Sequence, residues 1–234
     1  MVRRIHPSPS IETNVDEAYD APLGSGRPDR PWVQLSMVSS LDGSTVVDGT
    51  SGALSSPNDT AVLLRLRSLA EVILVGAGTA AGEGYGPPGK AGQRIGLVTR
   101  SGRLDTTTEL FRSGAAFVVT TETADLTDAG IDETSPIDVV RAGTSEVDLA
   151  AAVAEIGRRY GASTIQAEGG PMLNGALFDA DLVDELDLTS SPGVVGGSGP
   201  RLTRGGTDVT RTFILEFAAL DDRQFLFQRW VRRR

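Results

Sequence analysis

Short apolar runs alternate with segments of helical periodicity over most of the chain. Continuous apolar runs of about four to eight residues are typical of strands that are buried on both faces of a sheet. We therefore expect strands at residues 32–38, 44–47, 71–75, 94–99, 116–120, 137–140, 163–167 and 183–189. Two further runs, 212–220 and 224–231, flank the turn Asp221-Asp222-Arg223 and predict an antiparallel hairpin.

Three helices are predicted between these strands. Ser56 and Pro57 are typical of an N-cap and a first helical position, and Asp59 can complete a capping box, so a helix should extend to about residue 69. The second helix has apolar residues at helical spacing and ends at a glycine: Leu149, Val153, Ile156, Tyr160 and Gly161. The third helix opens at Gly169-Gly170-Pro171.

The alternation of strands and helices predicts an α/β fold, with a mainly parallel central sheet and helices on both of its faces. The C-terminal hairpin should add antiparallel strands at one edge. Residues 1–30 are rich in Pro, Ser and Gly, and we expect no regular structure in this N-terminal leader. Residues 31–234 show neither an internal repeat nor a linker, so they are interpreted as a single domain.

The composition narrows the chemistry. The 234 residues include no cysteine and one histidine, His6, which lies in the leader. Disulfides, thiolate ligands and cysteine nucleophiles are excluded, and a histidine-based catalytic triad is disfavoured. No acidic cluster suggests a metal site. Hydride transfer is favoured instead, because a cofactor supplies the reactive group.

Charge and hydropathy set the class of partner. The net charge of −9 argues against a nucleic-acid-binding surface over the whole chain. No apolar window approaches the ~18 residues of a membrane-spanning helix. The N-terminus also lacks the apolar core of a secretory signal. We therefore expect a cytoplasmic protein with a small-molecule substrate.

A strand followed by a glycine turn is the first candidate binding motif. Gly76, Gly78 and Gly82 follow the predicted strand 71–75 with a spacing close to that of a dinucleotide-binding loop, although the third glycine is one residue late. A tight turn that needs small residues explains the same pattern equally well. Arg100 lies at the end of the next strand, between Thr99 and Ser101. An arginine there favours the 2′-phosphate of NADPH over NADH, although exposed loop arginines are common.

The start of the third predicted helix is the second candidate. The segment Gly169-Gly170-Pro171-Met172-Leu173-Asn174 places free backbone N–H groups at a helix N-terminus, which suits a diphosphate. Glu168 precedes it at a strand end and is a candidate for substrate contact or, alternatively, a cap of the helix. Ser51 and Arg67 would suit a phosphate-bearing substrate, although each alone is more often a surface residue.

Several of these motifs, in this order, resemble the reductase domain of riboflavin biosynthesis. The matching segments extend over about residues 32–232 and are Ser40-Leu41-Asp42-Gly43, Asp48-Gly49-Thr50-Ser51, Leu66-Arg67, 73–79, 168–173 and 182–186. The resemblance implies a dihydrofolate-reductase-like fold, NADPH as hydride donor and a homodimer. The implied reaction is that of 5-amino-6-(5-phosphoribosylamino)uracil reductase. A dihydrofolate reductase-type activity and a non-catalytic NADPH-binding protein are the alternatives.

The resemblance also implies roles for individual residues. Thr79 and Glu83 should lie near the nicotinamide, and Val38 and Ala53 should line the same region through their backbone. Gly78 should contact the cofactor from the turn that carries Thr79. Residues 170–175 should hold the diphosphate. Ser51, Arg67 and Glu168 should hold the substrate, with Glu168 as the candidate catalytic group. Ser36 stands where many members have a lysine, and Ala53 stands where many have an aromatic residue. These departures bear on the substrate more than on the fold or cofactor.

Overall fold

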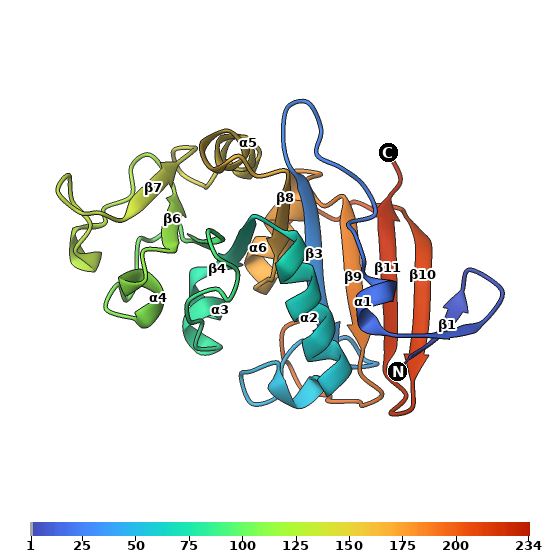
Figure 1. The fold of residues 1–234 in the computed structure, drawn as a ribbon. Coiled ribbons are helices and arrows are strands. Elements are labelled where there is room, and N and C mark those ends of the chain that lie inside the picture. The colour runs from blue at the N-terminus through green and yellow to red at the C-terminus, as the bar shows by residue number, and fades with distance from the viewer. Residues whose placement is uncertain (1) are drawn as a thin grey trace.

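The computed structural model describes residues 2–234, and the strands of this region form one eleven-stranded sheet (Figure 1). The spatial order is β2-β1-β10-β11-β9-β3-β8-β4-β5-β6-β7. The strands are β1 (Val2–His6), β2 (Ile11–Thr13), β3 (Trp32–Ser39), β4 (Val72–Gly76), β5 (Arg94–Val98), β6 (Ala116–Thr120), β7 (Asp138–Arg141), β8 (Thr164–Ala167), β9 (Glu185–Ser190), β10 (Phe213–Asp221) and β11 (Leu226–Arg232). The helices are α1 (Val15–Ala18), α2 (Pro57–Leu69), α3 (Ala77–Gly82), α4 (Glu109–Arg112), α5 (Leu149–Tyr160) and α6 (Pro171–Asp179). Gly52–Leu54 and Thr127–Ala129 form short 3-10 turns.

The sheet has a parallel part and an antiparallel part. Strands β9, β3, β8, β4, β5, β6 and β7 pair in parallel with their neighbours. Strands β2, β1, β10 and β11 are antiparallel, and β11 joins the two parts by pairing with β9. The predicted α/β fold with a mainly parallel sheet and a C-terminal antiparallel hairpin is therefore confirmed.

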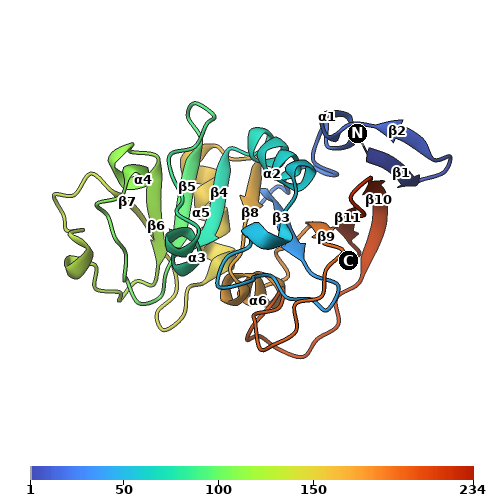
Figure 2. The same ribbon diagram turned by 90° about the horizontal axis from the view of Figure 1, so that it is seen from below.

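Helices cover both faces of the sheet, and α2 and α6 lie on opposite sides of β3 and β8 (Figure 2). On one face, Val33, Leu35 and Leu74 belong to a core that also contains apolar residues of α5 and α6. On the other face, Ile73 and Val75 pack in a core with residues of α3 and α4, and α2 adds Val62 and Leu66 to a third cluster. The alternation of side chains along each strand separates these cores.

Local capping explains why two helix boundaries agree with the sequence prediction. The Ser56 side chain accepts a hydrogen bond from the backbone N–H of Asp59, and Pro57 opens α2. Gly161 ends α5 in the left-handed conformation, with φ of 64°. Both signals act within one turn, so they do not depend on distant packing.

Three expectations differ from the structure. Residues 44–47 form no strand, because the N–H groups of Ser44 and Thr45 donate to the Ser40 hydroxyl and the Pro200 carbonyl instead of to a neighbouring strand. Residues 1–30, expected to lack regular structure, contain β1, β2 and α1. The C-terminal hairpin does not form the edge, because β1 pairs with β10 and β2 extends the sheet further.

A buried ionic cluster attaches the N-terminal segment to the sheet. Arg229 of β11 pairs with Glu185 at 2.6 Å and with Asp187 at 3.1 Å, and it also donates to the carbonyls of Ala18 and Ala21. Burial, together with the neighbouring Glu185 carboxylate, raises the pKa of Asp187 well above its usual value. The cluster therefore holds a proton more tightly in the folded chain than in the unfolded chain.

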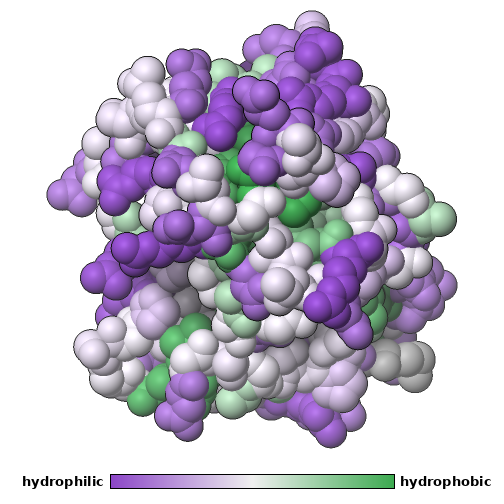
Figure 3. Space-filling view, turned by 90° about the vertical axis from the view of Figure 1, so that its left-hand side faces the viewer, coloured by the Kyte–Doolittle hydropathy of each residue, from purple (hydrophilic) through white to green (hydrophobic). Residues whose placement is uncertain are grey.

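The surface at the β7 end of the sheet is mostly hydrophilic, with small hydrophobic areas between the polar side chains (Figure 3). Among the described residues, no helix is both long and apolar enough to cross a membrane.

Candidate active site

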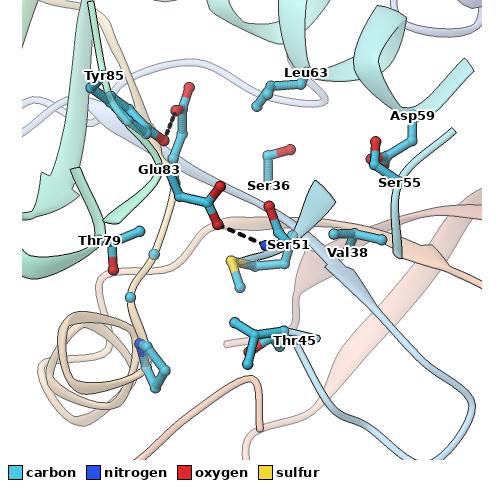
Figure 4. A pocket seen from close by; sticks show the side chains of 16 residues that line it. Ser36, Val38, Thr45, Ser51, Ser55, Asp59, Leu63, Thr79, Glu83 and Tyr85 are labelled. Carbon is cyan, nitrogen blue, oxygen red and sulfur yellow. Dashed lines mark hydrogen bonds between the residues drawn. The ribbon is translucent and has the colours of Figure 1, made fainter. Parts of the chain in front are cut away.

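Two cavities lie at the carboxyl end of the parallel strands. The smaller, of about 150 Å³, is lined by residues of β3 and α2, the 45–55 loop, α3 and the β8–α6 connection (Figure 4). The larger is a groove of about 970 Å³ bounded by the β4–α3 and β5 ends, the loop before α5, and α6. Thr79, Gly170 and Pro171 line both cavities. Ligands of open α/β sheets bind at this edge, so the two cavities are suited to two adjacent ligands.

Glu168 is the centre of the polar wall of the smaller cavity. Its carboxylate accepts two hydrogen bonds from Arg67, at 2.7 Å from Nε and 2.6 Å from Nη2. The Tyr85 hydroxyl donates to the same carboxylate at 2.5 Å, and the Arg67 guanidinium lies 5.2 Å from the centre of the Tyr85 ring. Burial and the nearby Glu168 charge raise the pKa of Tyr85, so Tyr85 remains a hydrogen-bond donor.

Glu83, which follows α3, also lines the smaller cavity. Its Oε1 accepts the backbone N–H of Ser51 at 2.8 Å, a bond that connects the end of α3 with the loop before α2 (Figure 4). Asp59 also lines the cavity and accepts a 2.6 Å hydrogen bond from Ser55. Burial raises the pKa of Asp59. The cavity is thus rich in acceptors, which suits a substrate that carries amino and ring N–H groups.

The two glycines after Glu168 permit a close approach of backbone segments. Gly76 donates to the Gly169 carbonyl at 2.7 Å, and Gly169 has a φ of 88°. A Cβ on Gly170 would overlap Thr79 Oγ1. The wall between the two cavities is therefore formed by bare backbone and one threonine, and any larger residue at position 170 would intrude on it.

The N-terminus of α6 faces the groove. Gly170, Pro171, Met172 and Leu173 line it, and the N-cap position supplies no side-chain hydrogen bond. The first turn of a helix has backbone N–H groups without intrahelical partners, and its dipole attracts anions. These properties fit the diphosphate of a dinucleotide, and the groove volume lies within the usual range of ligand sites, about 300–1,000 Å³.

Arg100 and Ser101, which the sequence suggests as ligands of a 2′-phosphate, line the groove. Arg100 Nη1 lies 2.6 Å from the Glu146 carboxylate, and both side chains are exposed. Glu146 and Arg204 also line the groove but were not found from the sequence. Neither belongs to a recognisable motif, and both lie in loops, between β7 and α5 and between β9 and β10.

Most of the residues predicted from the sequence meet at the cavities. The smaller cavity contains Ser36, Val38, Ser51, Thr79, Glu83, Glu168 and Gly169, and the groove contains Gly78, Thr79, Arg100, Ser101, Gly170, Pro171, Met172 and Leu173. Arg67 reaches the site only through Glu168. Tyr85, which the sequence did not mark as functional, completes that contact.

Three predicted cofactor residues lie outside the lining of both cavities. Asn174 is fully buried and donates to the Leu202 carbonyl at 2.8 Å, because its side chain points away from the groove. Thr99 is buried behind Arg100, and Ala53 is exposed on the 3-10 turn before α2. Within residues 2–234, no set of three or more His, Asp or Glu side chains is arranged to hold a metal ion.

In this protein a groove with a helix N-terminus opens onto a smaller polar cavity, at the carboxyl edge of a mainly parallel sheet. This arrangement is typical of the dihydrofolate-reductase-like class of reductases. Residues 31–224 match the model of the RibD C-terminal domain, and the chain belongs to this family. The resemblance found in the sequence is therefore confirmed.

Similar proteins have related names. A curated 2,5-diamino-6-ribosylamino-4(3H)-pyrimidinone 5′-phosphate reductase of Methanothermobacter thermautotrophicus is 26% identical over 191 residues, covering 77% of this chain and 86% of the relative. The crystal structure of a pyrimidine reductase-like protein from Corynebacterium diphtheriae has a TM-score of 0.77 and 25% identity, and the match covers 95% of this chain and 100% of that one. The riboflavin biosynthesis reductase Rib7 of Saccharomyces cerevisiae shares the fold, with a TM-score of 0.68, 20% identity, and coverage of 90% and 93%.

Proposed function

We propose that this chain is a reductase of riboflavin biosynthesis that uses NADPH to reduce 5-amino-6-(5-phosphoribosylamino)uracil. The observation that carries the proposal is the junction of the two cavities at Thr79 and Gly170. A dinucleotide in the groove would present its reactive end there, against a substrate in the acceptor-rich cavity. Proximity of this kind accounts for a large part of the rate of hydride-transfer enzymes.

The residues of the groove fit the cofactor. The backbone N–H groups of Met172 and Leu173, in the first turn of α6, would hold the diphosphate. Arg100 and Ser101 would hold the 2′-phosphate, because a guanidinium binds phosphate oxygens through a planar set of donors. When bound, NADPH supplies the hydride.

The reaction needs one hydride and one proton. The ring C1′–O bond of the ribosylamine breaks as the nitrogen lone pair forms a C=N bond, and the ring oxygen takes the proton. Hydride addition at C1′ then completes the ribityl chain. Arg67 and Tyr85 occupy three acceptor positions of the Glu168 carboxylate and hold it in place, and its remaining position, on Oε1, would accept one pyrimidine N–H. The acceptor-rich wall thus orients the substrate instead of supplying the reactive group.

A second candidate substrate is the amino form of the pyrimidine. The Methanothermobacter relative is named for the 2,5-diamino-pyrimidinone, which has an amino group at C2 where the uracil compound has a carbonyl. The Glu168 carboxylate, which is an acceptor when ionised, is compatible with that extra donor. The two compounds are therefore compared directly in the experiment below.

The test is NADPH oxidation followed at 340 nm, with the uracil compound, the diamino compound and dihydrofolate assayed side by side. We expect turnover of a ribosylaminopyrimidine at or above ~1 per second, within the usual range of enzymes. Turnover of dihydrofolate alone would overturn the proposed substrate. Tight NADPH binding without turnover of any of the three would identify a non-catalytic binding protein.

The remaining proposals concern assembly and location. We retain the homodimer that the family resemblance implies, and static light scattering should give twice the mass of the chain. We also retain a cytoplasmic location, which cell fractionation tests. A monomer at micromolar concentration would contradict the first proposal, and recovery in the secreted fraction would contradict the second.

A further inference from the structure

The far end of the groove brings two opposite charges together from different loops. Arg100 follows β5, and Glu146 lies in the loop between β7 and α5. Their side chains meet at 2.6 Å, with exposed fractions of 65% and 72%. Both residues line the groove that we assign to the dinucleotide. The cation proposed to bind a 2′-phosphate is therefore already paired with a carboxylate.

The loop that carries Glu146 is fixed by its own backbone. Asp148 donates its N–H to the Ala142 carbonyl at 3.1 Å, and Gly143 has a φ of 78°. A Cβ on Gly143 would overlap the Glu146 carbonyl, so the chain turns tightly at this point. The loop therefore holds the Glu146 backbone beside the groove, whatever its side chain binds.

Three carboxylates occur among the described residues of the groove, and the other two are occupied. Asp148 caps α5 by accepting the Ala151 N–H at 3.0 Å. Asp179 accepts hydrogen bonds from the N–H and hydroxyl of Thr207 and pairs with Arg211. Glu146 is bonded to the Arg100 cation alone among the described side chains. An exposed pair of this kind is weak and exchanges readily with other partners.

We propose that Glu146 sets the preference of this protein between NADPH and NADH. The proposal rests on the assignment of the groove to a nicotinamide dinucleotide. When a 2′-phosphate binds Arg100, Glu146 must release the guanidinium, and its charge then repels the phosphate dianion. When NADH binds, the same carboxylate can accept a hydrogen bond from the ribose hydroxyl, which is the contact that an acidic residue elsewhere in the chain makes in dinucleotide-binding folds.

Glu146 therefore weakens NADPH and strengthens NADH, whereas Arg100 does the opposite. The pair gives the groove one acceptor and one cation at the same point, so that either dinucleotide finds a partner. Because the site is exposed, salt screens both effects, and the preference should depend on ionic strength.

The test is fluorescence titration of NADPH and NADH binding to the purified full chain without substrate. The variants are Glu146→Gln, Arg100→Gln and a control, Glu155→Gln, which removes a carboxylate paired with Arg158 on the outside of α5. We expect Glu146→Gln to tighten NADPH and weaken NADH, each by about threefold or more at low salt. Arg100→Gln should weaken NADPH by about tenfold or more and should tighten NADH, because it frees the Glu146 carboxylate. Glu155→Gln should change neither.

An unchanged ratio of the two affinities in Glu146→Gln, or weaker NADPH binding, would overturn the proposal. If the wild-type chain binds NADPH or NADH but Glu146→Gln leaves the ratio of the two affinities unchanged, only this inference fails. If the wild-type chain binds neither dinucleotide, the cofactor assignment under the proposed function fails as well. Binding is measured without turnover, so the identity of the substrate does not affect the result.

Discussion

Replacing Glu168 by Gln tests the polar wall of the smaller cavity. The Glu168 side chain is 2% exposed and its partner Arg67 is 27% exposed. Glutamine keeps the shape but turns one acceptor oxygen into an N–H donor, which must face a donor of Arg67 or Tyr85. Breaking a fully buried pair costs about 3–5 kcal/mol, and partial exposure of Arg67 reduces this to about 2 kcal/mol.

Urea denaturation measures the loss of stability. With a typical slope of about 2 kcal/mol per molar urea, the midpoint should fall by about 1 M. The matched control is Glu133→Gln, which changes an exposed glutamate and should leave the midpoint unchanged. In the activity assay, kcat/KM for the pyrimidine should fall by about 100-fold or more, with NADPH affinity within twofold of wild type.

The two measurements separate a structural from a substrate-binding role. A lower midpoint with unchanged kcat/KM would make Glu168 a structural residue and remove it from the site. An unchanged midpoint would refute the reasoning about the Arg67 pair. If NADPH affinity falls as much as kcat/KM, the change has spread through Gly169 to the cofactor groove and the separation of the two cavities is wrong.

Three further outcomes follow from contacts described above. Gly170→Ala should weaken NADPH binding by about tenfold or more in fluorescence titration, because the new Cβ overlaps Thr79 Oγ1. The control is Gly86→Ala, where the new Cβ meets open space. Equal NADPH affinities of the two variants would contradict the prediction. Tyr85→Phe removes a buried hydrogen bond to the Glu168 carboxylate, so the free energy of unfolding measured in urea should fall by about 1.5 kcal/mol. An unchanged free energy of unfolding would mean that water replaces the hydroxyl. For Asp187, whose pKa is raised in the folded state, the contribution to stability is complete below the unfolded pKa of about 3.9 and is lost as the pH rises through the folded pKa. Urea midpoints between pH 4 and 8 should therefore depend less on pH in Asp187→Asn, and an unaltered slope would rule out this residue as the source.

The elements that the sequence predicted well are those whose signals are local or whose burial is complete. Helix α2 begins at its Ser56 cap, and α5 ends at Gly161. Strand β6 was predicted with its observed bounds, since all five residues are buried and apolar residues dominate. The cavities were predictable for the same reason, because the ends of buried strands and the glycines that follow them lie at one edge of a parallel sheet.

The features that the sequence did not predict depend on distant partners. Strand β1 contains mostly polar residues, and it is a strand because β10 supplies hydrogen bonds from the other end of the chain. The run 44–47 is apolar in its second half, but the N–H of Ser44 bonds to Ser40 and the N–H of Thr45 bonds to the distant Pro200 carbonyl. Tyr85 has no motif around it, and its contact with Glu168 exists only when the turn after α3 lies beside the residue that follows β8. Side-chain pairs of this kind become visible only in three dimensions.

The pairing of β1 with β10 has a consequence for the order of folding during synthesis. Val2 pairs with Asp221, so β1 leaves the ribosome long before its partner β10. The parallel strands β3 to β9 lie within residues 32–190 and can assemble earlier. Strand β1 can pair with β2 early, but its other edge remains open until β10 has been made. Contacts of such long sequence separation slow folding, and a chaperone that shields the open edge of β1 would have most of the translation time in which to act.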